Sequence, residues 1–283
     1  MRLRIGARLF EGPGPFLMGV VNATPDSFSD GGRFLATEAA ADHARRLVEE
    51  GADLVDLGGE STRPGSAPVP VEEELRRVVP VVERLRATGF TAPISVDTTK
   101  PAVARAALAA GADLVNDVSG LADLALAEVI ADAGAPAVLM HTRGTPAEMA
   151  QRAVYGDVVG EVAAELAGVV ARAVSAGIPV DRVILDPGIG FAKTPAQSVA
   201  LLAHLDALRA PGCPLLVGPS RKSFIGALTG APVEDRLPGT LAAVAACVLA
   251  GVEVLRVHDV GPARQAARVA AAIRDAATGR GAP

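Results

Sequence analysis

The sequence has no tryptophan, one tyrosine and only two cysteines in 283 residues. Cys213 and Cys247 lie inside apolar runs and lack the spacing of metal ligands, so we expect buried thiols in a reducing cytoplasm. The first ten residues lack the apolar core of a secretory signal, and no apolar run reaches the roughly 18 residues that span a membrane. These absences argue against a disulfide-stabilised secreted domain and predict no membrane partner.

Several signatures of catalysis are absent as well. The sequence has no HExxH zinc motif, no GxSxG nucleophile elbow, no GxxxxGK[ST] phosphate loop and no cluster of cysteine and histidine. The formal net charge of −5 gives no reason to expect nucleic acid as a partner. Lysine is scarce, and Lys100, Lys193 and Lys222 are the only three. Any of them is therefore a candidate for a role that needs a compact cation.

The letters GADLV occur twice, at 51–55 and at 111–115. Each copy follows an alanine- and leucine-rich stretch typical of a helix, and its glycine suits a helix C-terminus. The letters after the glycine begin an apolar, β-like run. The repeat therefore predicts a repeated unit of helix, glycine stop and buried strand.

Eight short apolar runs end in polar groups, which is typical of parallel strands covered on both faces. The polar residues at their ends are Asn22, Asp56, Asp97, Asn116, His141, Asp186, Ser220 and His258. Helical stretches separate most of the runs, at 37–50, 71–89, 100–110, 125–133, 158–176, 195–209, a pair within 223–252, and 261–277. The pattern predicts one α/β domain over 1–283, a single (β/α)8 TIM barrel, with an N-terminal hairpin across its bottom.

In such a barrel the carboxyl ends of the strands form the functional mouth. Any one polar residue there could be the N-cap of the next helix, but capping alone explains eight of them less convincingly. Carboxylates and amides at this edge can bind the donor and acceptor groups of a polar heterocycle. Arg63, Arg256 and His258 can bind a polyanion, and RVHDVGPARQ (256–265) predicts a helix N-terminus at the usual phosphate corner of the fold.

Seven motifs occur in order and lie near most of the predicted strand ends. They are MGVVNATPDSFSDGG (18–32), GGESTRPG (58–65), SVDTTK (95–100), VNDVSG (115–120), DPGIGFAKT (186–194), GPSRKSFIG (218–226) and RVHDV (256–260). On these motifs the chain resembles the dihydropteroate synthase family, from about residue 16 to residue 275. MHTRGTPAEM (140–149) departs from the Met-Gln or similar pair expected there, which leaves Thr142 and Arg143 without an assigned role.

The resemblance implies an enzyme, a transferase of folate biosynthesis. It implies that 6-hydroxymethyl-7,8-dihydropterin diphosphate and p-aminobenzoate condense to 7,8-dihydropteroate and pyrophosphate by an SN1-like mechanism. It also implies Mg²⁺ as cofactor, with Asn22 among its ligands, and a homodimer. The stretch TLAAVAACVLAGVE (240–253) is apolar nearly all round, which independently predicts burial on more than its barrel face and a dimer through the last helices.

The resemblance assigns roles residue by residue. The pterin would be held by Asp97, Asn116, Asp186 and Lys222. Asp97 would also stabilise the cation. Pyrophosphate would be bound by Arg63, Arg256 and His258. The p-aminobenzoate site would contain Phe28, Thr62, Pro64, Phe191 and Ser223, and Asp30 would close over it from the first loop.

Two rival functions share part of this pattern. A pterin-dependent methyltransferase domain, which passes a methyl group from methyltetrahydrofolate to a corrinoid, would not need the TPDSFSDGG, SRKS and RVHDV segments that are present here. A non-catalytic pterin- or phosphate-binding protein would be favoured by loss of Asp97, Lys222 or Arg63, and none is lost. We interpret Asp56 as a polar group of the barrel wall with a minor role, and Lys100 and Lys193 as surface cations near helix starts.

Overall fold

The computed structural model describes residues 1–23, 30–62, 65–210 and 212–279. Eight parallel strands lie in the order β8-β7-β6-β5-β4-β3-β10-β9, and a bridge between Leu185 and Leu215 brings the two outer strands together. The strands are β3 (Phe16–Asn22), β4 (Leu54–Gly58), β5 (Ile94–Asp97), β6 (Leu114–Asp117), β7 (Ala137–Met140), β8 (Val183–Asp186), β9 (Leu216–Val217) and β10 (Val254–Val257). The predicted (β/α)8 barrel is confirmed. Each apolar run forms a strand, and the polar residue named for that run lies in the strand or just beyond its end.

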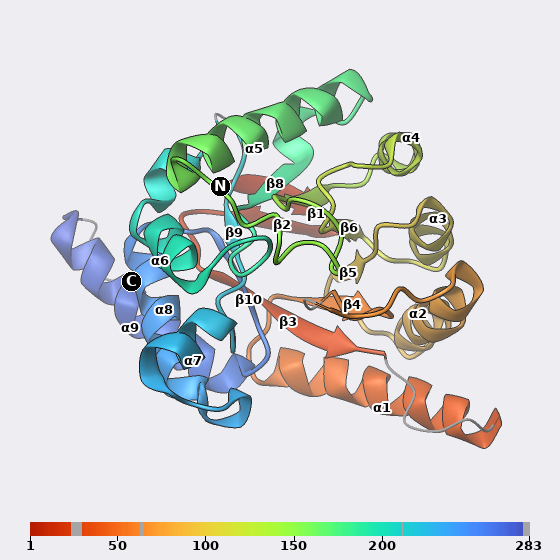
Figure 1. The fold of residues 1–283 in the computed structure, drawn as a ribbon. Helices are drawn as coiled ribbons and strands as arrows, with labels where there is room; N and C mark the ends of the chain where they lie inside the picture. The colour runs from red at the N-terminus through yellow and green to blue at the C-terminus, as the bar shows by residue number, and fades with distance from the viewer. Residues whose placement is uncertain (24–29, 63–64, 211, 280–283) are drawn as a thin grey trace.

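Helices surround the strands (Figure 1). They are α1 (Asp30–Glu49), α2 (Val71–Ala87), α3 (Pro101–Ala109), α4 (Leu124–Ala133), α5 (Val158–Ser175), α6 (Pro195–Ala203), α7 (Ser223–Thr229), α8 (Leu237–Leu249) and α9 (Val260–Ala277). The predicted start at residue 37 was wrong for α1, because two glycines near its start hide its first turns from a propensity argument. The predicted helix 195–209 is α6 followed by a short 3-10 helix, Leu205–Leu208.

The repeated letters GADLV form the same junction twice. Gly51 and Gly111 have φ of 107° and 110°, a region that favours glycine, and each ends a helix. The aspartate two residues later then accepts a hydrogen bond from the backbone of the preceding strand in the barrel. Asp53 Oδ2 accepts from Leu17 N at 2.8 Å, and Asp113 Oδ2 accepts from Ile94 N at 2.9 Å. The aspartate therefore fixes where neighbouring strands begin, which explains why both copies keep it.

The predicted N-terminal hairpin is confirmed as β1 (Arg2–Ile5) paired antiparallel with β2 (Arg8–Glu11). Three of its side chains, Leu3, Ile5 and Phe10, are almost completely buried. They form a cluster with residues at or near the starts of the barrel strands: Met18, Leu54, Leu114, Val138, Ile184, Leu216 and Val254. This apolar layer closes the barrel at the end opposite the polar residues. The candidate site residues therefore lie at one end of the barrel, where the strands have their carboxyl ends.

The rest of the core lies between the barrel wall and the helices. α2 illustrates why the helices form where they do. Its first turn is acidic and its last turn basic, as the helix dipole favours, and Val78, Val81, Val82 and Leu85 form a buried stripe. None of the helices in the described ranges combines the length and apolar character that crossing a membrane requires.

Candidate active site at the barrel mouth

Asp56, Asp97, Asn116 and Arg256 meet at the carboxyl end of the barrel. β5 pairs with β6 so that Asp97 and Asn116 are direct neighbours. Arg256 from β10 donates from Nε to Asp56 Oδ2 at 2.6 Å and from Nη2 to Asp97 Oδ2 at 2.9 Å. Asn116 Nδ2 donates to the same Asp56 oxygen at 3.0 Å. Asp56 is thus a buried polar group of the barrel wall, as expected, and it joins an arginine to an amide.

The side chains of Asp56 and Asp97 share the guanidinium of Arg256. Burial, reinforced by the negative charge of Asp56, raises the pKa of Asp97 to about 7, although Arg256 acts in the opposite direction. One oxygen of each carboxyl group, Oδ1 of Asp56 and Oδ1 of Asp97, is buried and has no hydrogen-bond partner among the residues that the structure describes. Unpaired buried acceptors are costly, and the one on Asp97, which lines the cavities described below, offers a binding position for a ligand with N–H donors.

Asp186 ends β8 and is also buried. Its Oδ1 accepts a hydrogen bond from Gly188 N at 2.7 Å, and burial raises its pKa. Two buried carboxyl groups with raised pKa values, those of Asp97 and Asp186, at the same end of the barrel are the pattern expected of a functional site.

Two cavities open above these residues. The larger has a volume of about 560 Å³. It is lined by Glu60, Thr62, Glu74, Asp97, Thr98, Thr99, Val118, Ser119, Ala122, Asp123, Thr142, Gly144, Thr145, Pro146, Met149 and Phe191. Its mixture of apolar and polar side chains suits a flat heterocycle with several hydrogen-bonding edges.

The smaller cavity, about 250 Å³, is lined by four cations, Arg221, Lys222, Arg236 and Arg256, and by two acidic residues, Glu60 and Asp97. Its charged and polar lining includes Asn22, Glu60, Ser61, Thr62, Asp97, Ser220, Arg221, Lys222, Ser223, Arg236, Arg256 and His258. Four cations around one small space are suited to a polyanion. Both cavities share Glu60, Thr62, Asp97 and Phe191, so they adjoin along these side chains.

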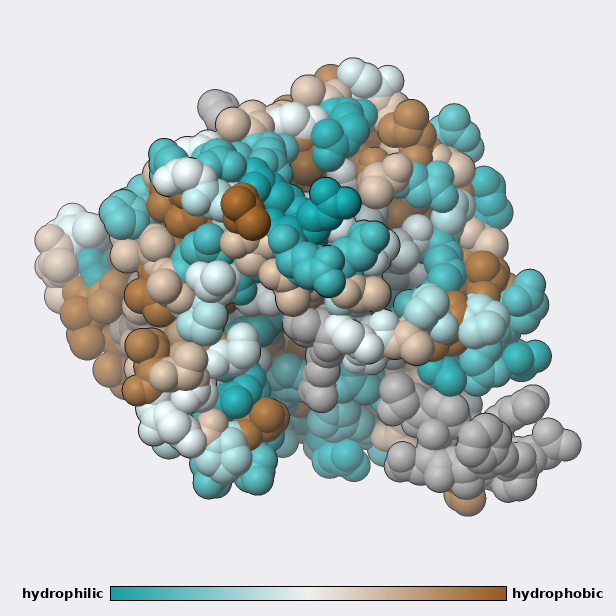
Figure 2. Space-filling model, viewed as in Figure 1, coloured by the Kyte–Doolittle hydropathy of each residue, from teal (hydrophilic) through white to brown (hydrophobic). Residues whose placement is uncertain are grey.

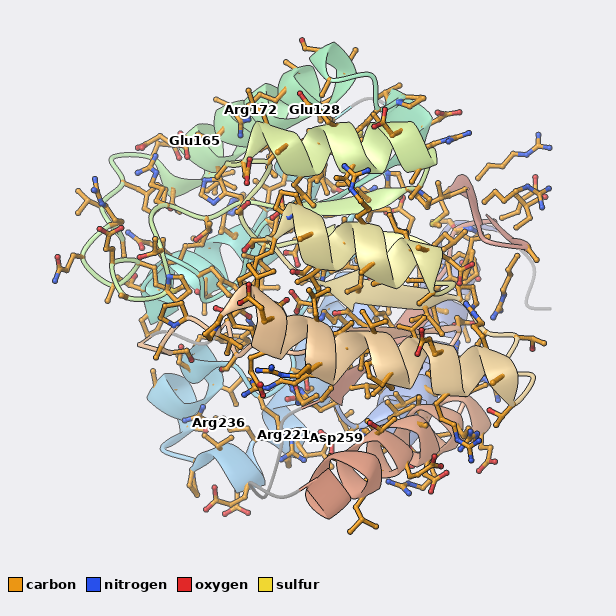
Figure 3. All side chains as sticks on the ribbon, turned by 90° about the vertical axis from the view of Figure 1, so that its right-hand side faces the viewer. Glu128, Glu165, Arg172, Arg221, Arg236 and Asp259 are labelled. Carbon is orange, nitrogen blue, oxygen red and sulfur yellow. The ribbon has the colours of Figure 1, made fainter. Side chains whose placement is uncertain are left out.

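The cations of the smaller cavity are held in place by neighbours. Lys222 Nζ lies 4.0 Å from the centre of the Phe191 ring, a cation–π contact. Arg221 pairs with Asp259 at 2.6 and 2.9 Å, and Arg236 lies nearby, as Figure 3 shows. His258 Nδ1 lies 2.9 Å from Ser220 Oγ.

Most residues predicted for the site come together here. Those that lie at the mouth are Asn22, Thr62, Asp97, Asn116, Asp186, Phe191, Lys222, Ser223, Arg256 and His258. Phe28, Arg63 and Pro64 lie outside the described residues, and Asp30 begins α1 with its side chain outside the description. The structure adds Glu60, Ser220, Arg221 and Arg236 to the lining. Ser220 and Arg221 belong to a motif already noted, whereas nothing in the sequence singled out Arg236.

Two lysines were misplaced by the sequence interpretation. Lys193 is 7% exposed and contacts His141, so it is not a surface cation. Lys100 is largely covered and pairs with Glu60 and the buried Glu74. In both cases the lysine folds back from a helix start towards acceptors on another element, which the local sequence does not reveal.

The comparisons with known proteins agree with this geometry. Residues 18–258 match the family model described as "Pterin binding enzyme". The chain is 45% identical to the dihydropteroate synthase of Synechocystis sp. over 96% of this chain and 94% of that protein. The solved dihydropteroate synthase of Yersinia pestis, in a sulfonamide drug complex, has a TM-score of 0.91 and 42% identity, covering 97% and 100% of the two chains. That of Xanthomonas albilineans, in complex with 7,8-dihydropteroate, has a TM-score of 0.85 and 46% identity, covering 97% and 99%.

The barrel and its donor-binding mouth thus define a pterin-binding enzyme. Both the buried carboxyl groups at the end of the barrel and the cavity lined by cations beside them fit one family of pterin-binding enzymes. The chain belongs to the dihydropteroate synthase family of transferases.

Proposed function

We propose that the two cavities together catalyse the condensation of 6-hydroxymethyl-7,8-dihydropterin diphosphate with p-aminobenzoate. The observation that carries this proposal is the position of Asp97, which lines both cavities and has one buried oxygen with no hydrogen-bond partner in the described part of the chain. The bond that breaks joins the pterin heterocycle to the diphosphate anion. Asp97 lies where the two cavities adjoin, which is where this bond would be placed.

The pterin ring binds over the polar floor. Asp97 and Asp186 accept hydrogen bonds from its N–H groups, and the amide of Asn116 lies beside them. Lys222 covers the ring from the Phe191 side. Among the described residues, the buried Oδ1 atom of Asp97 has no hydrogen-bond donor. This supports the arrangement, because an N–H group of the pterin would supply the missing donor.

The diphosphate occupies the basic cavity, where Arg256 and His258 bind it together with Arg63. Asn22 ends β3, is exposed and lines this cavity. The described residues contain no cluster of three or more His, Cys, Asp or Glu suited to a metal. Asn22 offers an amide oxygen, a ligand type that Mg²⁺ accepts, so it would hold the ion together with oxygens of the diphosphate and water. Bound Mg²⁺ would supply charge neutralisation for the leaving diphosphate.

The p-aminobenzoate site lies at the edge of both cavities, with Thr62, Phe191 and Ser223 as its described members. Phe28, Pro64 and Asp30 are assigned to this site by the family resemblance alone, since the structure does not describe their side chains. Ser223 is the first residue of α7, so the backbone there can face a carboxylate.

The reaction then follows an SN1-like course. The bond between the methylene carbon and the diphosphate oxygen breaks, and its electron pair leaves with pyrophosphate. The Asp97 carboxylate stabilises the resulting pterin cation because a fixed anion lowers the energy of nearby developing positive charge. The arylamine lone pair forms the new C–N bond, and the nitrogen releases one proton to water.

The direct test supplies the enzyme with pterin diphosphate, p-aminobenzoate and Mg²⁺ and measures 7,8-dihydropteroate and pyrophosphate. We expect the two products in equal amounts. Methyl transfer from methyltetrahydrofolate to a corrinoid, with no dihydropteroate formed, would instead establish the methyltransferase alternative. Binding of pterin without turnover would favour a binding protein.

We further propose that the enzyme is a cytoplasmic homodimer that pairs through α8 and α9. Leu249, Val269 and Ile273 are 49%, 63% and 56% exposed. They line a groove of about 420 Å³ between the two helices, where Figure 2 shows apolar residues gathered at the left. An apolar patch of this kind is costly to leave in water and typical of an interface.

Light scattering at micromolar concentration should give twice the mass of one chain. Replacing Val269 and Ile273 with glutamate should reduce the mass to that of one chain, because burying two carboxylates in an apolar interface is unfavourable. Val174→Glu on α5 is the matched control, since Val174 is 51% exposed and outside this groove. A wild-type monomer would contradict the proposed dimer.

A further inference from the structure

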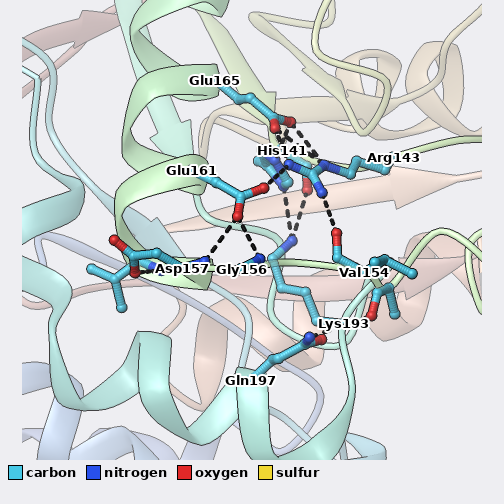
Figure 4. A network of polar contacts seen from close by, with 11 residues as sticks. His141, Arg143, Val154, Gly156, Asp157, Glu161, Glu165, Lys193 and Gln197 are labelled. Carbon is cyan, nitrogen blue, oxygen red and sulfur yellow. Dashed lines mark hydrogen bonds and ion pairs between the residues drawn. The ribbon is translucent and has the colours of Figure 1, made fainter.

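Lys193 lies in the loop between β8 and α6 and is the least expected buried charge near the mouth. Its Nζ is 2.9 Å from the backbone oxygen of Phe191. It also lies 2.8 Å from His141 Nδ1, a contact drawn in Figure 4. Only 7% of the residue is exposed. The Lys193 amino group therefore ties the loop that carries Phe191 to His141 at the end of β7, although burial lowers the pKa of Lys193 to about 7.

His141 continues the chain of contacts outward. It is 2% exposed, and its Nε2 lies 2.9 Å from Glu165 Oε2 on α5. Arg143 binds the same glutamate and also donates to Glu161 at 2.8 Å. Burial and the adjacent Lys193 lower the pKa of His141 to about 4, so the ring is neutral at neutral pH.

The polarity of this chain is fixed. Because Lys193 donates to Nδ1, the single ring proton of neutral His141 lies on Nε2 and faces Glu165. The contacts thus run from Glu165 through His141 to Lys193 and end at the Phe191 carbonyl. Each group has one orientation that satisfies both of its neighbours.

The loop has little freedom to adopt another arrangement. Ala192 has φ of 48°, a left-handed conformation that is strained for a residue with a Cβ. Gly188 has φ of 66°, and a Cβ there would lie 2.0 Å from the backbone oxygen of His141. A buried lysine is weak support for stability as such, since an apolar side chain of similar size often serves as well. What Lys193 supplies in addition is a donor at a defined point of the Phe191 backbone.

We propose that Lys193 is a positioning residue for the arylamine site, acting through Phe191. By holding the Phe191 carbonyl, it fixes the Phe191 ring against Lys222 and between the two cavities. The inference rests on the proposed function, because it treats Phe191 as part of the p-aminobenzoate site. Lys193 itself does not touch the substrate.

The test is a double-mutant cycle on the KM for p-aminobenzoate, with Lys193→Met, Phe191→Ala and the two combined. Lys193→Met should raise this KM by about tenfold and leave kcat within about threefold of wild type, because it disturbs binding rather than the transition state. In the Phe191→Ala background it should add nothing. Lys193→Gln, which keeps a neutral donor, should have a KM between those of wild type and Lys193→Met.

Lys100→Met is the matched control, because Lys100 binds Glu60 and Glu74 instead of Phe191. Its effect should multiply with that of Phe191→Ala. An unchanged KM in Lys193→Met, or a double mutant whose KM is the product of the two single effects, overturns the proposal. If Lys193→Met fails to fold, the Lys193→Gln cycle decides by the same criterion. A wild-type enzyme that makes no dihydropteroate would refute the proposed function, and is thereby distinguished from both results.

Discussion

Replacing Asp97 with asparagine should lower kcat by about 10²- to 10³-fold, the usual cost of removing one preorganised electrostatic group from a transition state. Asparagine keeps the size of the side chain and one acceptor oxygen, so pterin binding should weaken far less than turnover. Steady-state rates at saturation with both substrates measure the effect.

Asp123→Asn is the control for Asp97→Asn. Asp123 lines the same cavity and caps α4 by accepting a hydrogen bond from Ala125 N at 2.9 Å, a role that asparagine fills equally well. Its kcat should stay near the wild-type value. If Asp97→Asn retained kcat within about threefold of wild type, its carboxylate could not be the group that stabilises the cation.

The wild-type enzyme should also show the ionisation of Asp97 in its pH profile. The pKa of Asp97 is raised to about 7, so the carboxyl group is largely protonated below that pH and ionised above it. Because the ionised form is the active one, kcat/KM for the pterin substrate should rise with pH up to about 7 and then level off. The same rise in Asp97→Asn would assign the ionisation to the substrate instead.

Replacing Arg256 with leucine should cost about 3–5 kcal/mol in the free energy of unfolding, the typical effect of removing one partner from a buried ion pair. Arg256 pairs with Asp56, which is fully buried, and with Asp97. Without the guanidinium, the Asp56 charge has no counterion at hydrogen-bonding distance. Urea unfolding at neutral pH measures the loss.

The Arg256 result can be separated from a general effect of removing an arginine. Arg221→Leu breaks the pair with Asp259, in which the side chains are 31% and 22% exposed, and should cost about 1 kcal/mol or less. Asp56→Asn combined with Arg256→Leu should recover part of the stability, since it removes the stranded charge. Equal losses in Arg221→Leu and Arg256→Leu would show that the buried pair has no special importance.

The sequence was sufficient for the barrel because each unit repeats one local pattern. A glycine stops the helix, an apolar run forms the strand and a polar group ends it, and all three depend on neighbouring residues. Helix limits such as Val158–Ser175 therefore agree with prediction to within one residue. The largest differences are at α1, whose first residues include two glycines, and at the predicted helix 195–209, where α6 already ends at Ala203.

Contacts across the barrel could not be predicted in the same way. Arg256 and Asp56 are 200 residues apart, and no local pattern indicates that they meet at 2.6 Å. Arg256 consequently resembled a simple anion-binding residue, and Asp56 a wall residue. Lys193 lies just before the start of α6, and this position suggested a solvated side chain. Instead the chain makes a left-handed turn at Ala192, and the Lys193 side chain that follows points into the protein.

The hairpin at the opposite end of the barrel limits where substrates can enter and where products can leave. Leu3, Ile5 and Phe10 seal that end with apolar side chains, so both substrates enter and both products leave through one doorway. A molecule bound nearer to the open end of the barrel therefore blocks the exit of a molecule bound deeper inside. The order of release is thus built into the architecture, and inhibition by the last product to depart is its expected kinetic signature.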